Sequence, residues 1–169
     1  MILLSNNKLN RKISDMFIED RIDNYIKEHF YPAKVISVLM PVYLVGGGVR
    51  DIMCSKVPKD LDFVVLGNDR KWILEVFDKF NISYDYNKFG GFKINYNGIV
   101  VDLWLTEDLF SAIQYNVDGL LFDVSRSSLI SLSFNDFLDN GIREINPNNN
   151  IDNGREKKLI KFESEFKKI

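Results

Sequence analysis

The stretch YLVGGGVRDIMCSKVPKDLDFVV, residues 43–65, combines a glycine triplet with two aspartates that are separated by a single residue. The segments around it, VYLVG (42–46) and LDFVVLG (61–67), are short, rich in β-branched and aromatic residues and closed by glycine. These features predict two buried strands. VRDIMCSK between them is long enough for two helical turns before Pro58 ends the helix. The stretch therefore predicts a strand–turn–helix–strand unit.

Asp60 and Asp62 lie two residues apart on the second of these strands, so their side chains project from the same face, about 6–7 Å apart along the backbone. Two carboxylates placed side by side raise each other's pKa unless a cation lies between them. Mg²⁺ prefers oxygen ligands and usually takes one or two carboxylates together with substrate phosphates. An isolated Asp-x-Asp pair is more simply explained by two exposed aspartates where a strand begins, so the interpretation depends on the neighbouring turn.

The neighbouring turn contains Gly46, Gly47 and Gly48, which lack Cβ atoms and let a ligand approach backbone N–H groups where a helix begins. Arg50 follows with a guanidinium that can hold a phosphate through two hydrogen bonds. The alternative is a tight strand-to-helix connection that merely tolerates glycine. The phosphate-loop pattern G-x-x-x-x-G-K-[ST] is absent, and Asp51 stands where a dinucleotide fold needs its third glycine.

The rest of the chain predicts further elements around this unit. Asn97 and Gly98 separate two strand-like segments, which is the strongest short-range signal for a β-hairpin. Elements are expected at residues 8–31 (helix), 69–80 (helix), 92–96 and 99–105 (hairpin strands), 119–124 (strand) and 152–168 (helix). We therefore predict an α/β (α+β) fold, with a mixed β-sheet of about five strands and helices packed mainly on one face.

Asp102 interrupts the apolar second strand of this hairpin, in VVDLWL. An ionised carboxylate on a buried strand is costly without a partner, so Asp102 either lies at an edge or faces a metal ion. We expect its carboxylate to converge with those of Asp60 and Asp62.

Composition limits the class of protein. The chain has 169 residues, 46% of them apolar, which is enough for one ordinary core. The net charge of −2 gives no overall attraction to nucleic acid, so such a partner would need a local patch. The single Cys54 cannot form an internal disulfide, and no apolar run is long enough for a signal peptide or a membrane span. We expect a soluble cytoplasmic protein without a membrane partner.

G-G-G-V-R-D, a short helix and then K-D-L-D-F-V-V together resemble the head domain of the bacterial CCA-adding enzymes and poly(A) polymerases, in the DNA polymerase β nucleotidyltransferase superfamily. The similarity resumes in LLFDVSRSSLISLSFNDFLDNGIREINP, residues 120–147. It implies a polymerase-β-like nucleotidyltransferase palm. The activity it implies is Mg-dependent transfer of a nucleoside monophosphate from an NTP to an acceptor hydroxyl.

The resemblance also implies roles for individual residues. The aspartates would bind two Mg²⁺ ions, and the turn would hold the nucleotide with help from the C-terminal helix, where two nucleotide-contacting arginines of the family fall on one arginine and one lysine. The implied catalytic and metal-binding residues are Asp60, Asp62 and Asp102, and the implied nucleotide-binding residues are Gly46, Gly47, Arg50, Arg155 and Lys158.

The sequence departs from the family in two places. AIQYNVDGLL (112–121) lacks the basic pair and aspartate of the family's R-R-D-F-T-I-N-A-like segment, and the chain ends at Ile169, without neck, body or tail. We therefore expect a single head domain over residues 1–169 that does not add CCA by itself. A separately encoded RNA-binding protein or antitoxin is a candidate partner.

The acceptor stays open at this point. An RNA 3′ end such as that of tRNA is one candidate. A small molecule or a protein is another, and the nearly neutral net charge fits it better, since RNA affinity rests heavily on neutralised phosphates. A nucleotide-binding module without catalysis is the third, although the intact aspartates and glycine turn argue against it.

Overall fold

A computed structural model of the chain describes residues 2–3, 17–87, 90–147 and 155–167. Its centre is one mixed sheet with the strand order β1-β8-β7-β2-β3-β6-β5-β4. The strands are β1 (Ile2–Leu3), β2 (Val42–Val45), β3 (Asp60–Leu66), β4 (Tyr84–Tyr86), β5 (Phe92–Tyr96), β6 (Ile99–Thr106), β7 (Leu120–Asp123) and β8 (Ser128–Ser131).

All five strands expected from the sequence are present, as β2, β3, β5, β6 and β7. The predicted mixed sheet is confirmed, because β3 pairs in parallel with β6 and antiparallel with β2. The predicted number of about five strands is too low: within the described residues the sheet has eight, of which β1 contains only two residues.

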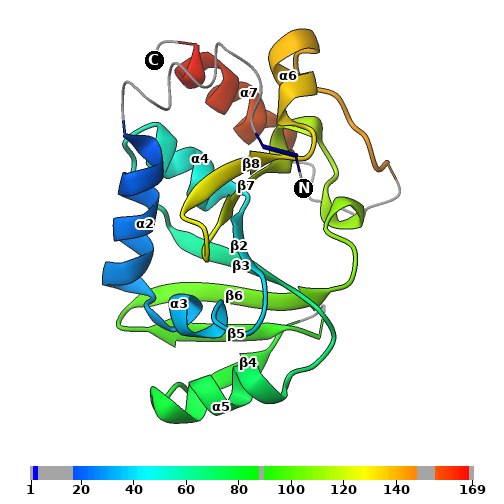
Figure 1. The fold of residues 1–169 in the computed structure, drawn as a ribbon. Helices are drawn as coiled ribbons and strands as arrows, with labels where there is room; N and C mark the ends of the chain where they lie inside the picture. The colour runs from blue at the N-terminus through cyan, green and yellow to red at the C-terminus, as the bar shows by residue number, and fades with distance from the viewer. Residues whose placement is uncertain (1, 4–16, 88–89, 148–154, 168–169) are drawn as a thin grey trace.

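The helices are α2 (Ile18–His29), α3 (Pro32–Ile36), α4 (Gly47–Met53), α5 (Lys71–Lys79), α6 (Phe134–Asn140) and α7 (Arg155–Phe166), with short 3-10 turns η1 (Phe110–Ala112) and η2 (Asn116–Gly119). In Figure 1, α6 and α7 lie beside the β7–β8 end of the sheet, and α5 lies beside β4 at the other end. The predicted N-terminal helix is confirmed over α2, and its expected residues 8–16 lie outside the described ranges, as do 152–154 and 168 of the C-terminal helix.

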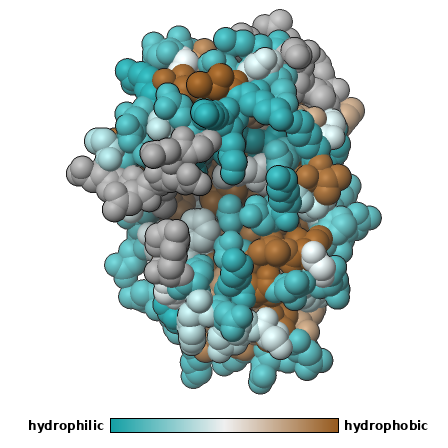
Figure 2. Space-filling view, turned by 180° about the vertical axis from the view of Figure 1, so that it is seen from behind, coloured by the Kyte–Doolittle hydropathy of each residue, from teal (hydrophilic) through white to brown (hydrophobic). Residues whose placement is uncertain are grey.

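The two faces of the sheet differ in what covers them. Leu61, Phe63 and Val65 of β3 point into the main core, which also contains the buried residues of α2, α4, α5, α6 and α7. A smaller cluster around Tyr43, Leu121 and Ile130 contains no residue of these helices. The helices thus pack mainly on one face, as predicted. Figure 2 shows the molecule from behind: most of that surface is hydrophilic, and apolar residues form separate patches on it.

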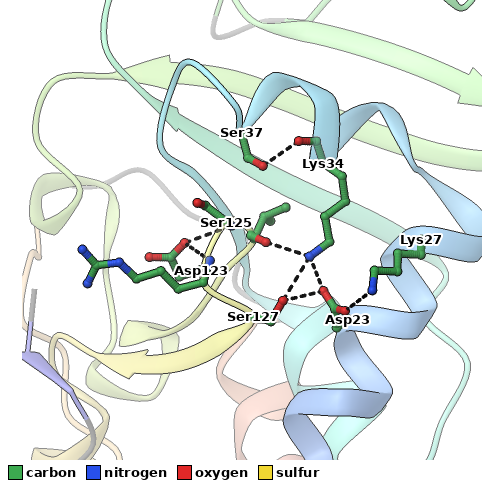
Figure 3. A network of polar contacts seen from close by, with 9 residues as sticks. Asp23, Lys27, Lys34, Ser37, Asp123, Ser125 and Ser127 are labelled. Carbon is green, nitrogen blue, oxygen red and sulfur yellow. Dashed lines mark hydrogen bonds and ion pairs between the residues drawn. The ribbon is translucent and has the colours of Figure 1, made fainter.

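A polar network ties two helices to the β7–β8 turn (Figure 3). Lys34 of α3 donates to the carbonyl of Val124 (2.8 Å) and to the hydroxyl of Ser127 (3.1 Å), and it pairs with Asp23 of α2. Burial alone would raise the pKa of Asp23, but hydrogen bonds from Lys27, Lys34 and Ser127 outweigh it and lower this pKa. No helix in the described ranges is long and apolar enough to cross a membrane.

Candidate active site

The three aspartates singled out in the sequence lie on two neighbouring strands. Asp60 begins β3, Asp62 follows two residues later, and Asp102 of β6 is the direct register partner of Asp62. Register partners on adjacent strands, and residues two apart on one strand, project from the same face of a sheet. The predicted placement of the aspartates on adjacent strands is therefore confirmed. Their role in metal binding stays a prediction.

The glycine turn lies against the same carboxylates. β2 ends at Val45, which is paired with Asp62, and α4 begins at Gly47. Gly46 between them has φ +68° and ψ −140°, a conformation that side chains disfavour. A Cβ atom on Gly46 would lie 3.7 Å from Oδ2 of Asp62, and one on Gly47 would meet nothing within 4 Å. The backbone of this turn is thus open next to the Asp62 carboxylate.

The electrostatics of the site centre on Asp62. Burial, and then the negative charges of Asp60 and Asp102, raise the pKa of Asp62 to about 7, while Arg155 and Arg50 lower it in part. The fold therefore holds more negative charge here than its own cations neutralise. Such a site favours binding of an added cation.

Arg50 does not extend freely into the turn. Its Nη1 donates to Oδ1 of Asp118 at 2.9 Å, and Arg155 of α7 reaches the same oxygen at 3.0 Å. Only 13% of the Arg50 side chain and 5% of the Asp118 side chain are exposed. The guanidinium also lies 5.8 Å from the ring centre of Phe162. Burial lowers the pKa of Arg50, and the Asp118 charge opposes this effect.

Asp118 is the site residue that sequence reasoning missed. It lies in η2, where its Oδ2 also accepts a hydrogen bond from the backbone N–H of Tyr115 at 3.4 Å. It is 68 residues from Arg50 in sequence, inside the segment that was read as lacking a basic pair and its aspartate. The only available signal was the lone acid in the apolar run VDGLLF.

The two predicted residues of α7 differ in their placement. Arg155 lies close enough to the aspartates to lower the pKa of Asp62, and it forms an ion pair with Asp118. Lys158 is exposed. The structure thus brings Gly46, Arg50 and Arg155 around the aspartates. Lys158 lies on the exposed surface of α7.

The residues fit Mg²⁺ as a cation shared with a substrate. In the described part of the chain, no group of three His, Cys, Asp or Glu side chains forms a metal-binding cluster by itself. The charge on Asp62 nevertheless lacks compensation, and the open glycine turn leaves room beside it. Mg²⁺ typically binds through one or two carboxylates and completes its octahedron with phosphates and water. The carboxylates of Asp60, Asp62 and Asp102 are oxygen donors of the type that Mg²⁺ uses.

Neither a protein-family model nor a curated protein matches the chain. Solved structures do match it. A CCA-adding enzyme in complex with ATP covers 78% of this chain and 36% of its own, with 21% identity and a TM-score of 0.59. A tRNA-processing enzyme with CTP covers 67% and 35%, with 22% identity and a TM-score of 0.54. The Thermotoga maritima CCA-adding enzyme complexed with tRNA covers 67% and 30%, with 24% identity and a TM-score of 0.51.

These likenesses confirm the fold that the sequence resemblance predicted. At such identities the shared feature is the fold. The chain spans roughly a third of the length of the structures that it matches, between 30% and 36%.

Proposed function

We propose that the chain is a Mg-dependent nucleotidyltransferase that transfers NMP from an NTP to an acceptor hydroxyl, and that the acceptor is the 3′ end of an RNA such as tRNA. One observation supports this most directly: Asp62 and Asp102 are register partners on parallel strands, and the open glycine turn faces Asp62. The neighbours of like fold include CCA-adding enzymes with CTP, ATP and tRNA, which supports the nucleotide and the RNA as substrates.

The reaction assigns distinct tasks to the residues. The acceptor oxygen forms a bond to the α-phosphorus, the bond from that phosphorus to the β-phosphate oxygen breaks, and pyrophosphate leaves with release of the hydroxyl proton. Asp60, Asp62 and Asp102 would hold two Mg²⁺ ions, which neutralise phosphate charge and lower the pKa of the acceptor hydroxyl. The backbone of Gly46 and Gly47 would orient the triphosphate, because its approach is unobstructed.

Arg50 and Arg155 have a supporting task in this proposal. Both are paired with Asp118, and both lower the pKa of Asp62. Their positive charges would favour the triphosphate electrostatically from the side of α7. Lys158, exposed on the same helix, would contact the outer part of the nucleotide.

The test is transfer of label from each α-labelled NTP, with Mg²⁺, to total RNA or to cell extract. Asp62→Asn and Asp102→Asn should abolish transfer, since each keeps the side-chain volume and removes charge that the metal needs. Asp78→Asn, on the exposed surface of α5, is the matched control and should transfer at the wild-type rate. Label appearing in a small molecule or a protein, with RNA unlabelled, would overturn the RNA acceptor. Transfer that persists in Asp62→Asn would overturn the role of Asp62 as a metal ligand, and no transfer by the wild type would overturn the proposed activity.

A further inference from the structure

Two more side chains share the sheet face of the aspartates. Lys93 of β5 is the direct register partner of Asp102, and Trp104 follows Asp102 by two residues on β6. All three therefore project from one face, Lys93 one strand away and Trp104 about 6–7 Å along the same strand. The row of register partners across the sheet is Val45, Asp62, Asp102, Lys93 and Asp85.

Trp104 differs from Trp72 in its surroundings. It is half-buried, yet it belongs to neither apolar cluster of the described residues nor to the half-buried residues packed against them. Trp72, the second tryptophan, packs against the main core and donates its indole N–H to the carbonyl of Ile36 at 3.1 Å. The register partner of Trp104 on β3 is the buried Val64, and the half-exposed Trp104 lies on the sheet face that also carries Asp102 and Lys93.

The backbone of Gly91 lies close against the Cβ atom of Trp104. A Cβ atom on Gly91 would come within 2.7 Å of the Trp104 Cβ and 2.5 Å of the Leu103 carbonyl oxygen. Only glycine at position 91 allows this close approach to β6. Asn87 closes the turn by accepting the N–H of Gly91 on its side-chain oxygen at 2.8 Å. The Cβ atom of Trp104 is therefore packed against a backbone segment that a hydrogen bond secures.

Lys93 supplies an available cation at the same place. It is exposed, and it forms no ion pair with another residue of the described ranges, although its register partners Asp102 and Asp85 are both acidic. A lysine that is flanked by carboxylates but not engaged by them can contact an incoming phosphate.

We propose that Trp104 and Lys93 form the acceptor-binding surface of this site, and that they bind a single-stranded RNA 3′ terminus. Trp104 stacks on the terminal base, and Lys93 contacts the phosphate that precedes it. Aromatic stacking combined with backbone neutralisation is how proteins bind single strands. The spacing suits the chemistry, because a nucleotide stacked on Trp104 has its ribose hydroxyls next to Asp102. This inference rests on the proposed function, which makes Asp102 part of the reacting centre.

Intrinsic fluorescence tests the stacking directly. The wild-type chain and Trp104→Phe are titrated with a short single-stranded oligoribonucleotide that has a free 3′ hydroxyl. The difference between the two signals isolates Trp104 and leaves Trp72 unchanged in both proteins. We expect saturable quenching in this difference signal. Adenosine alone, at the same concentration of base, should quench far less, because it lacks the phosphate that Lys93 contacts.

Affinity measurements with three variants complete the test. Trp104→Ala should weaken RNA binding roughly 5- to 100-fold, and Trp104→Phe should retain most of it, because stacking is lost only in the first. Lys93→Ala should weaken binding and reduce the slope of log K against log salt by about 0.7. Lys79→Ala, an exposed lysine of α5, is the control and should leave both quantities unchanged.

The outcomes separate this inference from the proposed function. Wild-type RNA affinity in Trp104→Ala and Lys93→Ala, or a difference signal without quenching, overturns the acceptor surface even if NMP transfer occurs. Quenching and loss of affinity in the variants support the surface even if no transfer is found, in which case only the proposed activity fails. Equal binding of the same oligoribonucleotide in a blunt-ended duplex would overturn the single-stranded terminus as the ligand.

Discussion

At the scale of single residues, Asp62 has an ionisation that should be visible in the stability of the protein. Its pKa in the folded chain is about 7, above the ordinary value of 3.8. Between these two values the folded state binds the extra proton, so this residue makes stability fall as pH rises from about 4 to 7.

Asp62→Asn removes this titration. Without divalent cations, we expect the variant to melt at nearly the same temperature as the wild type at about pH 4 and at a higher temperature at pH 8. Thermal unfolding in a chelator across this range measures the difference. Asp78→Asn serves as the comparison, and its melting temperature should follow that of the wild type at every pH. A difference for Asp62→Asn that is constant with pH would contradict the raised pKa.

Asp118 supports a second prediction, because it neutralises two arginines from different parts of the chain. Asp118→Ala should lower the free energy of unfolding by about 3–5 kcal/mol, since it leaves Arg50 buried without its partner. Denaturant unfolding measures this loss. Asp139→Ala, on the exposed side of α6, should change stability by less than about 0.5 kcal/mol.

The origin of that loss can be checked separately. Adding Arg50→Met to Asp118→Ala should recover part of the stability, because no unpaired charge is then buried. A double variant as unstable as the sum of its single variants would show that the pairing does not matter. Arg50 also illustrates a limit of the sequence: its position beside the glycines was visible, but its partner comes from η2 and its cover from α7.

At the scale of elements, length and apolar content together decided which strands the sequence revealed. The five predicted strands have four to eight residues and clear apolar content. β4 is the three-residue run Tyr84–Tyr86 with all residues exposed, and β8 is the run SLIS with two serines. Such short segments pair because neighbouring strands present a free edge. Whether an edge is free depends on the rest of the fold, so the sequence of the segment alone does not reveal the strand. The same reasoning applies to β1, whose two residues pair with β8.

The polar network of Figure 3 yields a prediction about how elements are joined. Asp23 and Lys34 have side chains that are only 12% and 16% exposed. Asp23→Ala should destabilise the fold by about 3–5 kcal/mol, because Lys34 would keep its charge in a mostly buried place. Because the network lowers the pKa of Asp23, its contribution is present above the ordinary value of 3.8 and is lost as pH falls through the lowered value.

The measurement is denaturant unfolding of Asp23→Ala beside Asp20→Ala, which changes an exposed acid in the first turn of the same helix. Only Asp23→Ala should show the large loss. Equal effects of the two substitutions would mean that the network does not hold α2 and α3 to the β7–β8 turn.

At the scale of the whole molecule, the sheet divides packing from chemistry. One face of β3 supplies Leu61, Phe63 and Val65 to the core shared with the helices, and the other presents Asp60 and Asp62. The alternation of the strand makes this division readable in the sequence, and the register with β6 brings in Asp102. The covering helix α7 was predicted as a helix, but its contact with Arg50 depends on packing that no local pattern encodes.

This arrangement predicts how the whole chain responds to nucleotide. By the proposed function, an NTP with Mg²⁺ would bind the folded state alone, so at a hundred times its Kd it should stabilise the protein by about 2.7 kcal/mol. For a chain of this size, about 2–4 °C of melting temperature corresponds to each kcal/mol, so a rise of roughly 5–10 °C is expected. The rise should require the cation, because the carboxylates repel the triphosphate unless Mg²⁺ lies between them. Asp102→Asn should lose most of it, whereas Asp139→Asn should keep it. A rise of the same size in a chelator, or in Asp102→Asn, would place the nucleotide elsewhere on the molecule.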